Sequence, residues 1–230
     1  MTFGRRQPRP ERASALRAPP LQPAAVQTGN LRHSANAATE LVAMLLAAYT
    51  FQERLQTEAA IAAAAALTGE FALRSTGVPL PEKSAVSSDA ANDVLFAGAP
   101  EGRATAWMFM MHAAIEAGVA EYDLPRIEAL AATLAQPPED GMPLPLSVQE
   151  KYLPRELPQN AGPRFRHKVI AIADTHDLSL REAAVALGAA TGQLIIRTQH
   201  DFPPQVAVTL AAEVMLTVAR MAPLAEAVEA

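Results

Sequence analysis

The residues best suited to chemistry are histidines and aspartates, because the chain has no cysteine. The five histidines are His33, His112, His167, His176 and His200. Two of them precede an aspartate, as His176-Asp177 and His200-Asp201. Imidazole and carboxylate groups are common metal ligands and acid–base catalysts, so each pair could contribute to a hydrolytic metal site. Aspartate at a helix end is also an ordinary capping residue, which explains both pairs without any chemistry.

The His-Asp pairs resemble those of the HD family of metal-dependent phosphohydrolases. That resemblance implies an all-helical fold, a divalent metal centre and hydrolysis of phosphoesters. The family pattern requires an earlier histidine, a His-Asp pair and a later aspartate, but no aspartate follows Asp201. If His176-Asp177 is the pair, His167 lies only nine residues upstream of His176, which is very close for that fold. We therefore rank the hydrolase hypothesis third and assign no catalytic, cofactor-binding or metal-binding residues.

The segment 178–197 resembles the helix-turn-helix motif of DNA-binding proteins. Ser179 and Glu182 have the spacing of a capping box, which predicts the start of a first helix. Ala184 is small where the two helices of such a motif cross, and Gly188 suits the turn between them.

The resemblance implies that a second helix, near residues 191–200, lies in the major groove of DNA. The residues expected to contact bases or phosphates are Arg164, Arg166, Lys168, Arg181, Gln193, Arg197 and His200. The match departs from the pattern at Arg197, where the motif has a buried apolar residue, and at Gly192, which weakens the second helix. Residues 164–201 carry five basic and four acidic groups, which is not a strongly basic footprint. The alternative is a pair of packed helices that does not bind DNA.

The apolar spacing predicts a long helix from Ser34 to about Arg74. Unbroken, it would be about 60 Å long, whereas a domain of this size is about 45 Å across. The helix must therefore break, near Thr57 or Gly69, or project towards a partner. Its alanine run at 59–66 favours close approach of another helix, so we predict self-association through this element. The residues expected at that contact are Leu41, Leu45, Ala59, Ala62, Ala63 and Ala66.

The run Trp107-Met108-Phe109-Met110-Met111 has two interpretations. Methionine and aromatic side chains adapt readily to different partners, so the run could form a binding surface. Such a run more often belongs to a hydrophobic core, which is the interpretation we favour.

Composition predicts four regions along the chain. Residues 1–29 are rich in arginine and proline and should be disordered; their acid-poor make-up also fits an organelle transit peptide. Residues 30–136 should form a helical module, residues 137–163 hold seven prolines and should be a linker, and residues 164–230 should form a four-helix module. Residues 1–32 carry a net charge of +5 and the remainder −10, so the arm could contact nucleic acid, anionic lipid or the body of the protein.

The sequence thus predicts an all-α protein with a long alanine-rich helix. The favoured function is a non-enzymatic, self-associating protein-interaction or regulatory role, without a cofactor. The second hypothesis is a DNA-binding regulator that uses residues 179–200. No apolar run reaches the roughly 18 residues of a membrane span, and the absence of cysteine suits a reducing cytoplasm.

Overall fold

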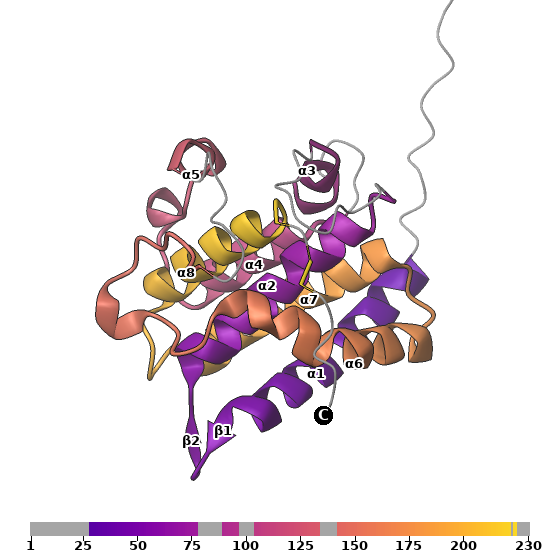
Figure 1. Ribbon diagram of the computed structural model, residues 1–230, viewed down its shortest axis with the longest axis horizontal. Coiled ribbons are helices and arrows are strands. Elements are labelled where there is room, and N and C mark those ends of the chain that lie inside the picture. Colours follow the sequence, from indigo (N-terminus) through magenta and orange to yellow (C-terminus); the bar gives the residue numbers. More distant parts are fainter. Residues whose placement is uncertain (1–27, 78–88, 97–103, 134–141, 222, 225–230) are drawn as a thin grey trace, which may run out of the picture.

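The computed structural model describes residues 28–77, 89–96, 104–133, 142–221 and 223–224, and in this part of the chain it is all-α, as predicted (Figure 1). The helices are α1 (Thr28–Tyr49), α2 (Thr57–Arg74), α3 (Asp89–Leu95), α4 (Ala106–Glu116), α5 (Ile127–Thr133), α6 (Ala161–Thr175), α7 (Leu180–Thr198) and α8 (Pro204–Val218). Short 3₁₀ turns are η2 (Glu121–Asp123), η3 (Glu150–Tyr152) and η4 (Pro158–Asn160). The strands β1 (Thr50–Phe51) and β2 (Arg54–Leu55) form a two-stranded antiparallel hairpin. The predicted arm lies outside the described residues except for positions 28 and 29, which begin α1.

Helix α2 lies at the centre of the fold. Residue 57 and residues 59–73 are all buried, and the helix packs against α1, α3, α6, α7 and α8 (Figure 1). Its alanine run has the highest helix propensity and leaves almost no polar face, and a helix that is apolar on all sides is stable only when it is covered. Because alanine side chains are short, the surrounding helices approach α2 closely.

The predicted long helix breaks just before Thr57, at one of the two expected positions. The break is the β1–β2 hairpin, whose two turn residues, Gln52 and Glu53, have φ angles of 49° and 63°. This left-handed backbone reverses the chain, so α2 folds back into the core instead of continuing α1. The hairpin leaves Phe51 65 % exposed.

The predicted division into two modules joined by a linker is wrong, because one hydrophobic core crosses the boundary. Helix α2 packs mainly against α7 and α8, which were assigned to the other module. In the described part of the proline-rich segment, Leu144, Pro158 and Gln159 are buried against the core. Prolines exclude regular helix or sheet hydrogen bonding, but the apolar residues between them still pack on the core.

A buried carboxylate holds this proline-rich segment in place. Glu213 of α8 is 2 % exposed and accepts a 2.8 Å hydrogen bond from the backbone N–H of Ser147. The hydroxyl of Ser147 donates a second hydrogen bond to the same carboxylate. The pair therefore satisfies a buried carboxylate while it ties residues 142–148 to α8.

A second buried carboxylate connects α2 to α6. Glu70 accepts hydrogen bonds from Nε of Arg166, at 2.6 Å, and from Nε of Arg74, at 2.7 Å. A Cβ added at Gly162 would overlap Oε2 of Glu70, so any larger residue there would have to displace this carboxylate. Arg166 also donates to the carbonyl oxygen of Leu224, at 2.7 Å, which fixes the chain beyond α8.

None of the described helices is both long enough and apolar enough to cross a membrane.

Candidate functional site

The predicted helix-turn-helix is wrong, because α7 is one continuous helix from Leu180 to Thr198. Its start is as predicted: Ser179 and Glu182 form the capping box. The chain does not turn at Gly188, where instead the absence of a side chain lets α4 approach. A Cβ at Gly188 would lie 2.5 Å from Cα of Ala106, and one at Gly192 would lie 2.8 Å from Cβ of Ala113. Helix α7 therefore takes the place of two of the four helices that were predicted for residues 164–230.

The residues predicted to contact nucleic acid do not form one surface. Arg166 is buried in its ion pair with Glu70. Arg181 donates to the carbonyl oxygen of Asp93, at 3.2 Å, and lies at the first turn of α7. His200 follows the last turn, about 28 Å away along the helix axis.

The other predicted contacts are also dispersed. Arg164 lies 3.4 Å from Oε1 of Glu156 and its guanidinium stacks over the rings of Tyr49 and Phe165. Lys168 is exposed on α6 and Arg197 is exposed near the end of α7. Gln193 is half-buried and faces a groove described below.

The two His-Asp pairs also lie apart, at opposite ends of α7. Nε2 of His176 lies 2.9 Å from Oε1 of Glu40, an interaction that joins the end of α6 to α1. Asp177 has a φ angle of 53° and belongs to the turn between α6 and α7. Within the described ranges, no three histidine, aspartate or glutamate side chains are grouped as a metal site would require. The geometry that the HD resemblance implies is therefore not present in this part of the chain.

The residues predicted for self-association form the protein's own core. Each is 2 % exposed or less: Leu41, Leu45, Ala59, Ala62, Ala63 and Ala66. The alanine run attracts helices of the same chain, mainly α7 and α8, instead of a second copy. This location for the contact is therefore wrong, whereas self-association itself stays a prediction.

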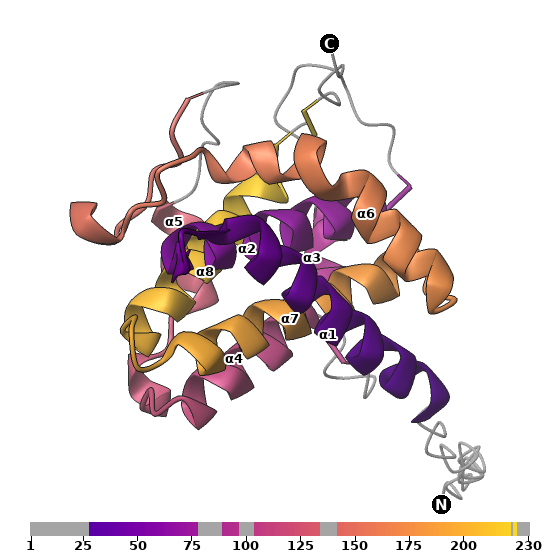
Figure 2. The same ribbon diagram turned by 90° about the horizontal axis from the view of Figure 1, so that it is seen from below.

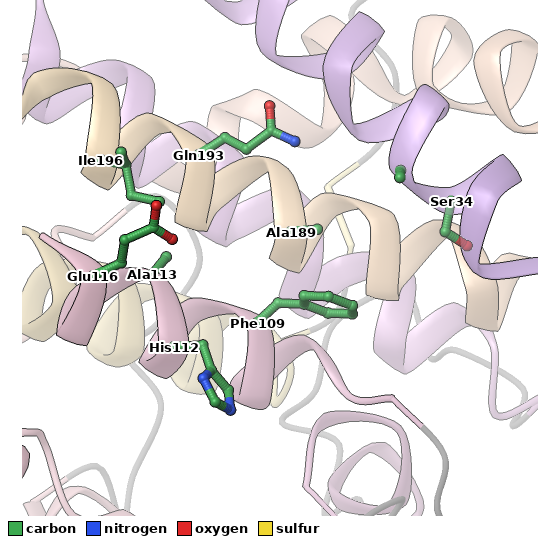
Figure 3. A pocket seen from close by; sticks show the side chains of 9 residues that line it. Ser34, Phe109, His112, Ala113, Glu116, Ala189, Gln193 and Ile196 are labelled. Atoms are coloured by element: carbon green, nitrogen blue, oxygen red, sulfur yellow. The ribbon is translucent and has the colours of Figure 1, made fainter. Parts of the chain in front are cut away.

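A groove runs along α7 between α1 and α4, and we call it the α7 groove (Figure 3). Its volume is about 360 Å³. The residues that line it are Ser34 and Ala35 of α1, Phe109, His112, Ala113 and Glu116 of α4, and Ala189, Gln193 and Ile196 of α7. The three α7 residues are spaced by four and three positions, so they form a single stripe on that helix.

The lining of the α7 groove is mainly apolar. Figure 3 shows Ile196 and Glu116 side by side at one end, and the ring of Phe109 along the wall formed by α4. His112 points away from α7 in the same view. The polar groups therefore do not converge on one point, and the groove suits an apolar side chain better than a phosphate or a metal ion.

Helix α4 also carries exposed apolar side chains that are not part of the lining of the groove. Met108 is 36 % exposed and Ile115 is 45 % exposed, while Met110 and Met111 are buried in the core. The run at 107–111 thus belongs to the core at Met110 and Met111, as favoured, while a binding surface at the exposed Met108 stays a prediction. The sequence analysis singled out Gln193 but missed Ala189 and Ile196. The helical spacing of 3.6 residues, which places both on the same face as Gln193, was the signal that could have found them.

Comparison with protein-family models, with curated proteins and with solved structures found no match. Function is therefore inferred from the geometry of this chain.

Proposed function

We propose that this protein is a non-enzymatic protein-interaction module whose α7 groove receives an apolar segment of a partner protein. The observation that carries the proposal is the groove itself, with Ala189 and Ile196 at its base and Phe109 on its wall. Grooves of this kind between helices bind apolar anchors from a partner helix or hairpin, and a few polar groups fix the orientation. Gln193 can supply such a group, because its amide both donates and accepts hydrogen bonds.

Binding explains the groove better than catalysis does. An active site needs titratable side chains that meet within hydrogen-bond distance of one reacting atom. In the α7 groove, His112 points away from α7 and Glu116 lies beside the apolar side chain of Ile196 (Figure 3). The cysteine-free composition supports a reducing compartment such as the cytoplasm for this interaction.

The test uses the absence of native cysteine, which permits labelling at one chosen position. Purified Gln193→Cys protein carrying a benzophenone photo-crosslinker is added to an extract of the source cells and illuminated. We expect discrete protein adducts from this position. The matched control is Thr175→Cys, at an exposed position on α6.

Two results would count against the proposal. Equal adduct patterns from the two positions would show that the groove has no special affinity. An adduct at Gln193 that nuclease removes would instead support the DNA-binding hypothesis.

A further inference from the structure

We propose that Ser147 is a phosphorylation site that controls the attachment of the proline-rich segment to α8. We call residues 142–148 the proline strap. The proline strap is closed on α8 while Ser147 is unmodified, and it is released when Ser147 carries a phosphate. The phosphate donor is a nucleoside triphosphate held by a protein kinase. Because this site is separate from the α7 groove, the inference does not depend on the proposed function.

The first observation is the contact that closes the proline strap. Ser147 is exposed, yet its hydroxyl and its backbone N–H both donate to the carboxylate of Glu213, which is 2 % exposed. A buried carboxylate depends on such donors, because it has lost the water that would otherwise solvate it. The hydroxyl of Ser147 therefore lies between solvent, from which an enzyme approaches, and the interior, where an added charge acts most strongly.

The second observation is the form of the proline strap. Residues 143–147 have neither helical nor strand structure, and both views show this part of the chain, between α5 and α6, on the outside of the molecule near α8 (Figure 1 and Figure 2). Pro143 and Pro145 hold the residues before them in extended conformations. An extended segment outside the helices can enter the cleft of an enzyme as a peptide does.

The third observation is the acidic residue that follows the serine. Glu150 is exposed and lies three positions after Ser147. Kinases discriminate among substrates by patterns of charge, and an acidic side chain at this spacing is the pattern that acidophilic serine kinases select. Ser179 is the other exposed serine in the described part of the chain, and Glu182 follows it at the same spacing. The local pattern therefore occurs twice, in two different surroundings.

Phosphorylation replaces the donor in the contact with Glu213 by an acceptor. Oγ of Ser147 attacks the γ-phosphorus, an Oγ–P bond forms, the bond from this phosphorus to the β–γ bridging oxygen breaks, and the nucleoside diphosphate leaves. The hydroxyl proton passes to the catalytic base of the kinase. The phosphate carries nearly two negative charges at neutral pH, and its dianion has no hydrogen to donate. Closure would bring two anions together at a buried position, where their repulsion is strong.

The nearest cation along the sequence does not offset this repulsion. Lys151 is exposed, and its ammonium group lies 4.6 Å from the centre of the Tyr152 ring. Water and salt screen an exposed cation, whereas they screen a buried carboxylate much less. The kinase acts on the proline strap during a transient local opening, and the phosphate then prevents closure. Release uncovers the part of the core that Leu144 covers in the closed form.

The same modification at Ser179 should have a different effect. Ser179 is the N-cap of α7, where the helix dipole favours negative charge. Its neighbouring carboxylate, Glu182, is part of the capping box and is not buried. Ser179 is therefore a matched control, which shares the local sequence pattern with Ser147 but has no buried carboxylate opposite it.

The first experiment is hydrogen–deuterium exchange of the full-length chain, measured by mass spectrometry on peptides from the proline strap. We expect the backbone N–H groups of residues 144–149 to exchange at least about tenfold faster in Ser147→Asp than in Ser147→Ala. Both variants lack the hydroxyl donor, so their difference isolates the negative charge. In Ser179→Asp the proline strap should exchange as in the wild type, because aspartate is as good an N-cap as serine. Equal rates in Ser147→Asp and Ser147→Ala overturn the inference.

The second experiment asks whether charge, and not size, opens the proline strap. Glu213→Gln in the Ser147→Asp background replaces the repelling carboxylate by an amide, whose N–H groups can donate to the new aspartate. We expect exchange in this double variant to slow towards the rate of Ser147→Ala, and a double variant as fast as Ser147→Asp overturns the inference. Far-ultraviolet circular dichroism should be unchanged in every variant, because the proline strap lies outside the helices.

The third experiment tests the modification itself. The full-length wild type is incubated with an acidophilic serine kinase and magnesium-ATP, and it is also isolated from growing source cells in the presence of phosphatase inhibitors. Mass spectrometry of peptides maps the phosphate in both samples. We expect phosphate on Ser147 in both, and we expect the proline strap of the phosphorylated chain to exchange as in Ser147→Asp. Absence of phosphate from Ser147 in either sample, or a phosphorylated chain whose proline strap exchanges as in the unmodified chain, overturns the inference.

Discussion

The buried ion pair between Glu70 and Arg166 allows a sharp test of this structure. The two side chains are 4 % and 7 % exposed, and 2.6 Å separates Oε1 of Glu70 from Nε of Arg166. Removal of one partner from a buried pair costs about 3–5 kcal/mol, because the other charge stays buried without compensation. Replacement of both by apolar residues of similar size is often nearly neutral.

The surroundings of the pair predict unequal single-variant effects. After Arg166→Met, Glu70 still accepts a hydrogen bond from Arg74, so the loss should be about 3 kcal/mol. After Glu70→Met, Arg166 keeps its hydrogen bond to the carbonyl oxygen of Leu224, but a neutral carbonyl offsets a buried positive charge less than a carboxylate does, so the loss should be about 4–5 kcal/mol. The double variant should lose less than the sum of the two by at least about 2 kcal/mol. Urea unfolding followed by far-ultraviolet circular dichroism measures all four free energies of unfolding.

Additive losses would refute the buried-pair interpretation. An Arg166→Met variant with unchanged stability would refute it as well, and would return Arg166 to the set of available phosphate contacts. The experiment therefore also decides between two roles for the same residue. A phosphate contact must be accessible, whereas the structure uses this arginine to join α6 to α2.

Three further predictions follow from other contacts. Gly188→Ala should destabilise the protein by about 1–2 kcal/mol in thermal denaturation. The overlap of the new methyl group with Ala106 outweighs the gain in helix propensity, which is about 1 kcal/mol. A melting temperature above that of the wild type would contradict this prediction. Ser147→Ala should cost about 1–3 kcal/mol in urea unfolding, since Glu213 loses a hydroxyl donor inside the protein, and an unchanged midpoint would count against that contact. Burial, and secondarily a neighbouring carboxylate, raises the pKa of Tyr49 above its usual value, so the unfolded state ionises first and stability should fall as pH rises above about 10. Tyr49→Phe should remove that part of the decline in melting temperature between pH 9 and 11.

Local signals in the sequence predicted the fold class and several helix boundaries correctly. The capping box at Ser179 and Glu182 predicted the start of α7, because it depends only on residues three positions apart. The length of the segment 34–74 required a break, and Thr57 was one of the two positions proposed. The first inference succeeded because a capping box involves residues within one helical turn, and the second because it compares the length of a helix with the width of a domain.

Contacts between residues far apart in the sequence explain the predictions that were wrong. Gly188 looked like a turn residue, but its missing side chain serves the contact with Ala106, which lies 82 positions away in the sequence. The proline-rich segment looked like a linker because proline marks irregular backbone, yet irregular backbone can still cover a core. Arg166 looked accessible because nothing local reveals Glu70.

The arrangement around α7 shows why the groove and the core cannot be separated. One side of the helix, which includes Leu187 and Leu194, is buried in the core, and Gly188 and Gly192 bring α4 against a second side. The stripe of Ala189, Gln193 and Ile196 lies between α4 and α1, so the width of the α7 groove depends on how closely α4 approaches. Any residue larger than glycine at position 188 or 192 must push α4 outwards. This displacement would widen the α7 groove and weaken the packing of the core. The same two glycines therefore set both the packing of α4 and the width of the groove, although the helix, considered alone, would be more stable with alanine at both positions.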